Sequence, residues 1–176
     1  MRRTMIFKSR WGWVGVAESE KGIATIVLPQ PTRMKVVSAL RAGLEMPSDE
    51  SPSTRLRAAR KQLLEYLSGT RKSFSLPLDL SEGTGFQQRV WKALESVPYG
   101  QLRSYQGLAD SIGGKQYARA VGSAVGANPL PVVIPCHRIV TQNASLGGFS
   151  CGLPMKRKLL ALEGSLSQLR RPGRHA

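Results

Sequence analysis

The sequence predicts an N-terminal α/β domain, built from a small antiparallel sheet plus helices, followed by a mainly α C-terminal domain with a helix-turn-helix. Three observations lead to this fold class. The first thirty residues are rich in β-branched and aromatic residues, with glycines at turn positions. Beyond residue 85, apolar residues recur at helical spacing. The small, polar segment 81–85 separates the two patterns, so we place a linker there.

The N-terminal part, residues 1–80, contains one strongly helical segment. It starts at Ser and Thr capping candidates and ends at Gly69. Its apolar face consists of Leu56, Ala59, Leu63 and Leu67. The other elements follow from strand-forming and turn residues: strands over 4–19, 21–29 and 73–80, a hairpin turn over 18–22, a short helix over 34–44 and a polar loop over 45–53.

The C-terminal part, residues 86–164, reads as mainly helical. Its first helix stops at Pro98 and carries Phe86, Val90, Trp91 and Leu94 at helical spacing. Two short helices, over 104–113 and 115–128, flank a pair of glycines and predict the helix-turn-helix. The remaining segments are a buried apolar stretch over 129–140, a glycine-rich loop over 141–154, a basic-apolar helix over 155–164 and a basic, disordered tail over 165–176.

Positive charge is the strongest signal in the composition. The chain has 26 Lys and Arg against 11 Asp and Glu, a formal net charge of +15. A protein this basic attracts polyanions, so nucleic acid is the first partner to consider, and generic basic faces are the alternative. From Thr84 onward, twelve basic residues accompany only three acids, which makes this half the better candidate for a phosphate-binding face.

Cysteine usage and hydropathy exclude several classes of protein. Two cysteines do not form the disulfide framework of a small secreted protein. No long apolar run follows the basic start, and none is long enough to span a bilayer, so we expect an intracellular protein with no membrane partner. The cysteines and histidines lack metal-ligand spacing, and we expect no metal.

Cys136 and His137 are adjacent in a chain that has only two residues of each type. A cysteine is nucleophilic as the thiolate, and His137 is the obvious base. In a regular strand the two side chains would point to opposite faces, so the chain must turn at Pro135, or His137 must act through a water. Glu163 is the only acid after Asp110 and is a candidate to orient His137. The alternative is that Cys136 is a buried, inert thiol and Glu163 merely ends a helix.

The predicted helix before this pair is built from small residues. Arg119 is its only long charged side chain between Tyr117 and Asn128. A small-residue face allows close approach to another surface, which is either DNA, with Arg119 reaching inward, or another helix. The small residues are Ala118, Ala120, Gly122, Ser123, Ala124 and Gly126.

Four motifs together resemble the O6-alkylguanine-DNA alkyltransferases, also called methylated-DNA–protein-cysteine methyltransferases. They are SYQGLA at 104–109, ARAVGSAVGANP at 118–129, PCHRIV at 135–140, and LGGFSCGL with LLALEG between 146 and 164. The resemblance is dense from Phe86 to Gly164, whereas the N-terminal half matches in its layout alone. It implies an RNase H-like N-terminal domain and a winged-helix-like helix-turn-helix.

The resemblance also implies a single-turnover DNA repair reaction without a cofactor. The helix-turn-helix would bind duplex DNA through the minor groove, and O6-alkylguanine would be flipped out of the stack. Cys136 would take the alkyl group, His137 would take the thiol proton through a water, and Glu163 would support His137. Asn128 would tie the turn after the recognition helix to the segment that carries Cys136. We therefore expect a monomer that acts in the cytoplasm or on the nucleoid.

The same resemblance assigns the DNA contacts and the base pocket. Arg119 would fill the gap in the duplex, and Tyr105 would lie beside the phosphate of the flipped nucleotide and donate a hydrogen bond to guanine. The remaining DNA contacts are Gln106, Ala118, Ala120 and Ser123. The alkylguanine pocket consists of Tyr105, Ile139, Phe149, Ser150 and Cys151. Whether the protein also accepts O4-alkylthymine, and whether it binds cooperatively along DNA, stays open.

The sequence departs from the family pattern in three respects. Phe149 stands where several members carry Tyr, and Cys151 stands where Gly is usual. We expect Cys151 to crowd the pocket mouth against bulky adducts such as benzyl, and a disulfide with Cys136 is an open alternative. The zinc ligands of some relatives are absent from the N-terminal part, because both cysteines lie in the second half.

Three other functions compete with this interpretation. A non-reactive alkylated-DNA-binding protein would share the fold but lack the reactive Cys136, which is present here. A helix-turn-helix regulator would need specific base readout, and often a dimerisation element, and the sequence offers neither. A Cys-His hydrolase would need an oxyanion hole and would turn over many times.

Overall fold

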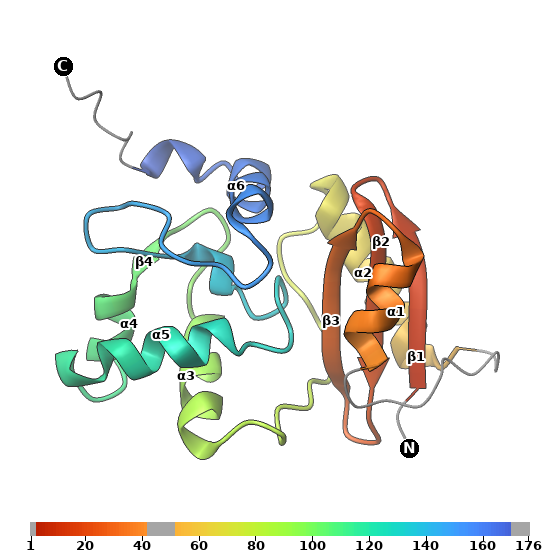
Figure 1. Ribbon diagram of the computed structural model, residues 1–176, viewed down its shortest axis with the longest axis horizontal. Helices are drawn as coiled ribbons and strands as arrows, with labels where there is room; N and C mark the ends of the chain where they lie inside the picture. The colour runs from red at the N-terminus through yellow and green to blue at the C-terminus, as the bar shows by residue number, and fades with distance from the viewer. Residues whose placement is uncertain (1–2, 42–51, 170–176) are drawn as a thin grey trace. The chain divides into compact units, whose positions relative to one another are not determined.

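The computed structural model describes residues 3–41 and 52–169 and divides the chain into two compact units (Figure 1). One unit comprises Met1–Glu82 and Pro129–Pro131, and the other comprises Gly83–Asn128 and Val132–Ala176. The first contains a small sheet with helices and the second is mainly helical, so the predicted two-part α/β and α organisation is confirmed.

The sheet of the first unit is an antiparallel meander in the order β1-β2-β3. The predicted segment 4–19 forms two strands, and the predicted hairpin turn is closed by a 2.8 Å hydrogen bond from the Ser19 N–H to the Gly22 carbonyl. The strands are β1 (Arg3–Ser9), β2 (Gly12–Glu18) and β3 (Ile23–Gln30).

Helices α1 (Arg33–Arg41) and α2 (Thr54–Ser68) cover opposite faces of this sheet. Side chains alternate along a strand, so Phe7, which pairs with Val14 of β2, faces away from Ala17. Ala17 packs in one cluster with Val36 and Leu40 of α1. On the other face, the Arg60 guanidinium of α2 lies 5.9 Å from the centre of the Phe7 ring.

The strong helix prediction before Gly69 is confirmed as α2. The Ser53 hydroxyl accepts a hydrogen bond from the Leu56 N–H, and Gly69 ends the helix in the left-handed region at φ 86°. The four predicted face residues are all buried. The end of the predicted 34–44 helix and most of the 45–53 loop lie outside the described residues.

The predicted strand over 73–80 is wrong. This segment forms one isolated bridge, in which the Ile23 N–H donates to Pro77 and the Asp79 N–H donates to Ile23, both at 2.8 Å. Pro77 has no N–H group, so the segment cannot continue a ladder along β3.

The second unit contains the predicted helix-turn-helix, formed by α4 and α5 (Figure 1). Gly113 and Gly114 form the turn at φ 142° and 119°, values that a side chain disfavours. The predicted single helix 115–128 is a 3₁₀ turn followed by a shorter α-helix. The elements are α3 (Gly85–Glu95), β4 (Arg103–Ser104), α4 (Tyr105–Asp110), η1 (Lys115–Tyr117), α5 (Ala118–Gly126), η2 (Cys136–Arg138), β5 (Ile139–Val140), α6 (Leu153–Leu162) and η3 (Leu166–Gln168).

A short parallel strand pair brings α4 beside the cysteine segment. Arg103 and Ser104 of β4 pair with Ile139 and Val140 of β5. Tyr105 follows β4 directly and β5 follows η2, so the pairing holds the start of α4 next to the Cys136 turn.

The chain is ordered beyond the expected domain end at residue 164. Ser165 is fully buried and η3 follows it, whereas sequence analysis assigned both to a disordered tail. The Ser165 N–H and hydroxyl both donate to the Leu160 carbonyl at the end of α6, and this explains the order. Residues 170–176 of that predicted tail lie outside the described residues. Among the described helices, none is long and apolar enough to cross a membrane.

Candidate functional site

Cys136 begins the short 3₁₀ helix η2, directly after Pro135. The Cys136 N–H donates to the Ile134 carbonyl at 2.8 Å, and this bond turns the chain where the sequence requires a turn. Cys136 is 2% exposed and His137 is fully buried. The turn allows both adjacent side chains to lie inside the unit, which an extended strand with one solvent face would not allow.

Burial raises the pKa of the Cys136 thiol to about 11, and a hydrogen bond from the Asn128 side chain partly offsets this effect. Asn128 follows α5, and its Nδ2 also donates to the Ile134 carbonyl at 2.8 Å. Asn128 therefore joins the end of the helix-turn-helix to the cysteine segment. At neutral pH Cys136 rests as the thiol.

His137 forms a buried pair with Glu163, in which Nε2 and Oε1 are 2.9 Å apart. Glu163 stands at the end of α6. Burial lowers the pKa of His137, and the hydrogen bond that His137 makes to Glu163 opposes that shift without reversing it. The imidazole is therefore neutral at pH 7 and can accept a proton.

Arg138, which sequence analysis missed, holds the carboxylate in place. Arg138 Nε donates to Glu163 Oε2 and Nη2 donates to Oε1, each at 2.9 Å. Nη1 donates to the Val97 carbonyl at 2.6 Å, and the Gly100 N–H donates to Glu163 Oε2 at 3.1 Å. With both oxygens bound, Glu163 is fixed as a carboxylate facing His137.

Tyr105, the first residue of α4, lies against the glycine-rich loop. Its hydroxyl donates to the Gly148 carbonyl at 3.3 Å. A Cβ atom at Gly147, whose φ is +65°, would lie 3.0 Å from the Tyr105 ring, so this close approach depends on glycine. Burial raises the pKa of Tyr105, and Cys136 adds to that shift, so Tyr105 keeps its proton and can act as a donor.

Lys156 is a second buried residue that sequence analysis missed. It is fully buried on α6. Its Nζ donates to the carbonyls of Ile139 at 2.5 Å, Gly148 at 3.2 Å and Leu146. Burial lowers the pKa of Lys156 to about 8, and Cys136 counteracts this shift.

The predicted pocket residues differ in exposure. Ile139 is buried in β5 and Phe149 is half-buried, whereas Ser150 and Cys151 are exposed on the loop. Cys151 Sγ lies 3.9 Å from Ser150 Oγ and interacts electrostatically with Cys136. Cys151 is therefore at the outer side of the region around the buried thiol.

Helix α5 presents the predicted small-residue surface. Arg119, Ala120 and Ser123 are exposed, and a methyl group added at Gly122 or Gly126 would meet no atom within 4 Å. Among the described residues, no hydrogen bond joins the side chains of Arg119 and Ser123 to Cys136, His137 or Glu163. Gln106 and Ala118, which are also predicted to contact DNA, are half-buried.

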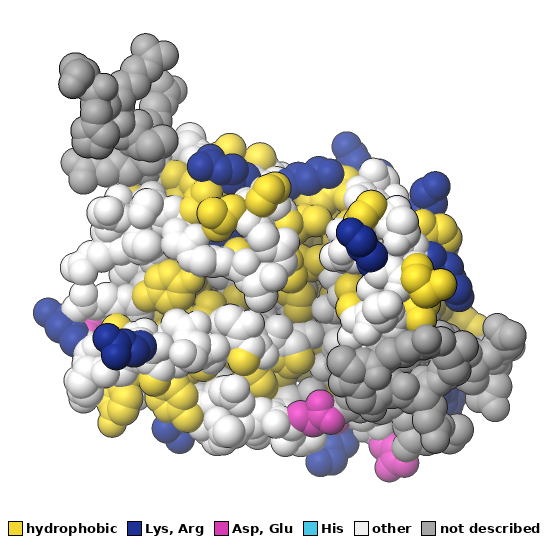
Figure 2. Space-filling model, viewed as in Figure 1, with side chains coloured by type: hydrophobic (Ala, Val, Ile, Leu, Met, Phe, Trp, Pro, Cys, Tyr) yellow, Lys and Arg dark blue, Asp and Glu magenta, His cyan; other side chains and the backbone are white. Residues whose placement is uncertain are grey.

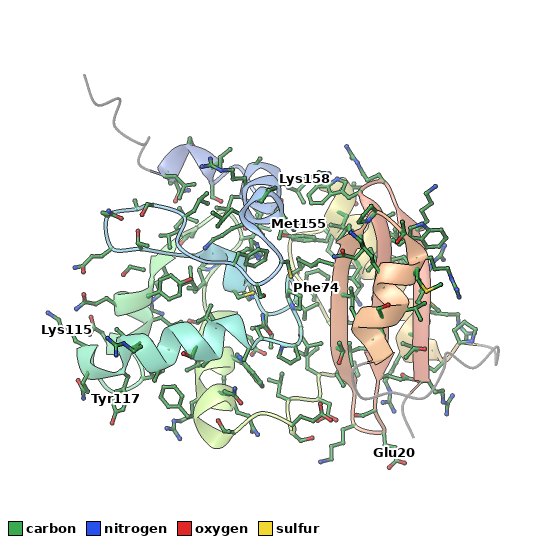
Figure 3. All side chains as sticks on the ribbon, in the orientation of Figure 1. Glu20, Phe74, Lys115, Tyr117, Met155 and Lys158 are labelled. Carbon is green, nitrogen blue, oxygen red and sulfur yellow. The ribbon has the colours of Figure 1, made fainter. Side chains whose placement is uncertain are left out.

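Ala124, predicted on the same small-residue surface, is instead buried. Its carbonyl accepts a 2.8 Å hydrogen bond from Trp91 Nε1 of α3. At the N-terminal end of α5, Tyr117 is exposed and packs at 6.0 Å against Phe86, and Figure 3 shows Tyr117 there beside Lys115.

The face shown in Figure 2 carries many Lys and Arg side chains and few acids, and no histidine is visible on it.

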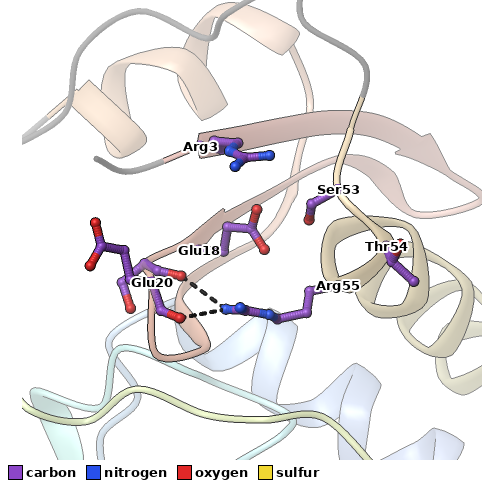
Figure 4. A pocket seen from close by; sticks show the side chains of 7 residues that line it. Arg3, Glu18, Glu20, Ser53, Thr54 and Arg55 are labelled. Carbon is purple, nitrogen blue, oxygen red and sulfur yellow. Dashed lines mark hydrogen bonds between the residues drawn. The ribbon is translucent and has the colours of Figure 1, made fainter.

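A separate cavity of about 310 Å³ lies in the first unit, beside the start of α2 (Figure 4). Arg3, Glu18 and Arg55 line it, and Arg55 Nη1 donates to the Ser19 and Glu20 carbonyls. This cavity contains neither a cysteine nor a histidine. In the part of the chain described, no three His, Cys, Asp or Glu side chains gather to hold a metal ion.

Two family models match the chain. Residues 1–80 match the ribonuclease-like domain of 6-O-methylguanine DNA methyltransferase, and residues 85–165 match its DNA binding domain. The chain is 48% identical over 101 residues to the constitutive methylated-DNA–protein-cysteine methyltransferase of Bacillus subtilis. This match covers 57% of the chain and 59% of that relative, so it spans about three fifths of the relative's length.

Two further relatives are matched over more of their length. The methylated-DNA–protein-cysteine methyltransferase of Methanosarcina barkeri is 45% identical over 121 residues, which cover 68% of this chain and 76% of that protein. The crystal structure of Mycobacterium tuberculosis OGT in complex with DNA has a TM-score of 0.77 and 36% identity, covering 93% of this chain and 94% of that one.

Proposed function

Because the chain belongs to the 6-O-methylguanine DNA methyltransferase family, we propose that it repairs O6-alkylguanine in duplex DNA by moving the alkyl group irreversibly to Cys136. The observation that carries this proposal is the buried relay around the thiol. Cys136, His137 and Glu163 are all buried, and His137 Nε2 lies 2.9 Å from Glu163 Oε1. In the proposal they act as nucleophile, base and orienting carboxylate. Asn128 contacts the thiol and Arg138 fixes the carboxylate.

The transfer conserves atoms and charge. His137 takes the thiol proton through a water, using the ring nitrogen that does not face Glu163. Sγ then forms a bond to the alkyl carbon as the bond from that carbon to guanine O6 breaks. The electron pair stays on the guanine, and Tyr105 donates a hydrogen bond to it. His137 gives the proton back through water, so that the thiol proton ends on the guanine and the imidazole is neutral again. The thioether product has no leaving group that this site can activate, so one protein repairs one lesion.

The resting state is neutral, because the thiol keeps its proton and the imidazole lacks one. Burial raises the pKa of the thiol to about 11 and lowers the pKa of the imidazole, so both shifts disfavour transfer of the proton from Cys136 to His137 in the resting site. Moving the proton therefore costs free energy until the guanine leaves. This cost protects the thiol from other electrophiles until a substrate is bound.

DNA recognition is assigned to the exposed surface of α5. Arg119 enters the duplex in place of the flipped guanine, while the small residues around Ala120 and Ser123 allow the helix to approach the minor groove. The relative crystallised in complex with DNA, which is 36% identical over nearly the whole chain, supports DNA as the partner. The winged-helix-like docking and the monomeric state belong to the same proposal, as does a cytoplasmic or nucleoid location close to the DNA substrate.

The stoichiometry of repair tests the function. Excess duplex with one O6-methylguanine is mixed with a known amount of protein, and the lesions that remain are counted over time. The proposal predicts that repair stops at one lesion per protein molecule and is absent in Cys136→Ser, which still binds the duplex. Continued turnover would indicate a hydrolase. DNA binding without any repair by the wild type would indicate a non-reactive binder.

A further inference from the structure

Lys156 links three segments of the second unit through one buried ammonium group. The carbonyls that accept from Nζ belong to Ile139 in β5 and to Leu146 and Gly148 in the glycine-rich loop. We propose that Lys156 is a positioning residue for alkyl transfer, which pins the pocket loop to the cysteine segment and supports the negative charge that develops on Cys136. This role rests on the proposed function and adds to it a residue outside the relay.

The pinned loop leads directly to the predicted pocket wall. Phe149, Ser150 and Cys151 follow Gly148 without a break. Gly148 also accepts the Tyr105 hydroxyl, so one carbonyl binds both the proposed guanine donor and Lys156. Movement of Gly148 would therefore displace the pocket wall and Tyr105 together.

A charged Lys156 suits these acceptors better than a neutral amine. An ammonium has three N–H donors, and three carbonyls surround it here. A neutral amine has two donors and a lone pair, so one buried carbonyl would face a lone pair instead of a proton. Deprotonation should therefore loosen the loop as well as remove the charge.

The charged and titratable groups around Lys156 favour this role. Cys136 and Lys156 interact electrostatically, since Cys136 raises the pKa of Lys156, and Lys156 in turn lowers the pKa of His137. Arg138 is committed to Glu163, while Tyr105 and Cys151 keep their protons at neutral pH. Within α6, Arg157 and Lys158 are exposed. Unlike Arg157 and Lys158, Lys156 is therefore buried inside the unit, where its charge lowers the pKa of the Cys136 thiol.

The rate of transfer should consequently fall in alkaline solution. Burial lowers the pKa of Lys156 to about 8, so the group is charged below that pH and neutral above it. The support for the thiolate is complete at pH 7 and is lost as the pH rises through 8. Neither His137, already neutral, nor Cys136, with a pKa of about 11, titrates in this window.

The test measures single-turnover methyl transfer at saturating duplex between pH 6.5 and 9.5. We expect the wild-type rate to be level to about pH 7 and to fall as the pH rises through 8. Lys156→Met should react at least about tenfold more slowly at pH 7, because a charge near the thiol is lost, and should lack the alkaline fall. Arg157→Gln on the same helix should keep both the rate and the alkaline fall.

Amide hydrogen exchange separates positioning from folding. Exchange in the 141–152 loop should rise in Lys156→Met and stay unchanged in Arg157→Gln, while α2 in the other unit stays protected in both. Lys156→Arg keeps a charge at every pH and should remove the alkaline fall.

Two results would overturn the inference: a wild-type rate that stays level to pH 9.5, or a Lys156→Met protein with normal rate and loop exchange. The wild-type profile decides the matter even if the variants fail to fold. Absence of any transfer by the wild type would instead contradict the proposed function.

Discussion

Replacing His137 with glutamine removes the proposed base while leaving a donor that can face Glu163. In the proposed mechanism His137 takes the thiol proton during the reaction, so the wild-type rate should not depend on pH between 6.5 and 7.5, below the pH at which Lys156 loses most of its charge. Without it, only the thiolate already present can react. With a thiol pKa of about 11, about one Cys136 in ten thousand is ionised at pH 7. The variant should therefore react about 10²–10⁴-fold more slowly at pH 7, the range expected for loss of a general base.

The pH dependence of the variant carries more information than the size of the loss. The thiolate fraction rises as the pH rises, because the pKa lies far above the working range. The rate of His137→Gln should therefore increase about tenfold for each pH unit between 6.5 and 7.5, whereas the wild type stays level. Rapid mixing with a duplex that carries O6-methylguanine gives both profiles, and binding of the same duplex is the control. A level profile for the variant would refute the role of His137 as the base.

Four other changes test separate parts of the account. Arg138→Met leaves a buried carboxylate without its cation, so unfolding should cost about 3–5 kcal/mol less and Tm should fall by about 6–20 °C in a thermal melt, with exposed Arg157→Met as the control. Cys151→Gly should speed labelling by O6-benzylguanine, and an unchanged rate would show that Cys151 does not crowd the pocket. Arg119→Ala should slow repair in duplex DNA more than reaction with free O6-methylguanine base; an equal loss on both would contradict its role in flipping. Deleting 170–176, with three arginines, should lower the slope of log affinity against log salt by at most about 3, and no change would place those residues off the DNA.

The elements that the sequence predicts well are those whose signals are local. Helix α2 has a capping serine, a terminal glycine and an apolar stripe, and all three are seen in the structure. The segment 73–80 has residues that favour a strand, but it forms only one isolated bridge with the sheet. Strand pairing depends on distant backbone that the local sequence does not reveal. The 3₁₀ turn η1 and the order of Ser165 also depend on contacts formed after folding.

Rarity explains which site residues the sequence reveals. Cys136 and His137 stand out because each type occurs twice, and Glu163 because acids are scarce in its half. Arg138 and Lys156 belong to a set of 26 basic residues, most of which face solvent in a protein of this kind. Their burial results from the meeting of α6, η2 and the glycine-rich loop, and no spacing in the sequence marks it.

Transfer of a labelled methyl group tests the central claim most directly. A duplex carrying O6-trideuteromethylguanine is mixed with excess protein, and the protein is then digested and analysed by peptide mass spectrometry. We expect the labelled methyl group to appear on Cys136, at one per repaired lesion, and Cys151 to stay unmodified. Label on Cys151, or repaired DNA with no label on the protein, would contradict the account.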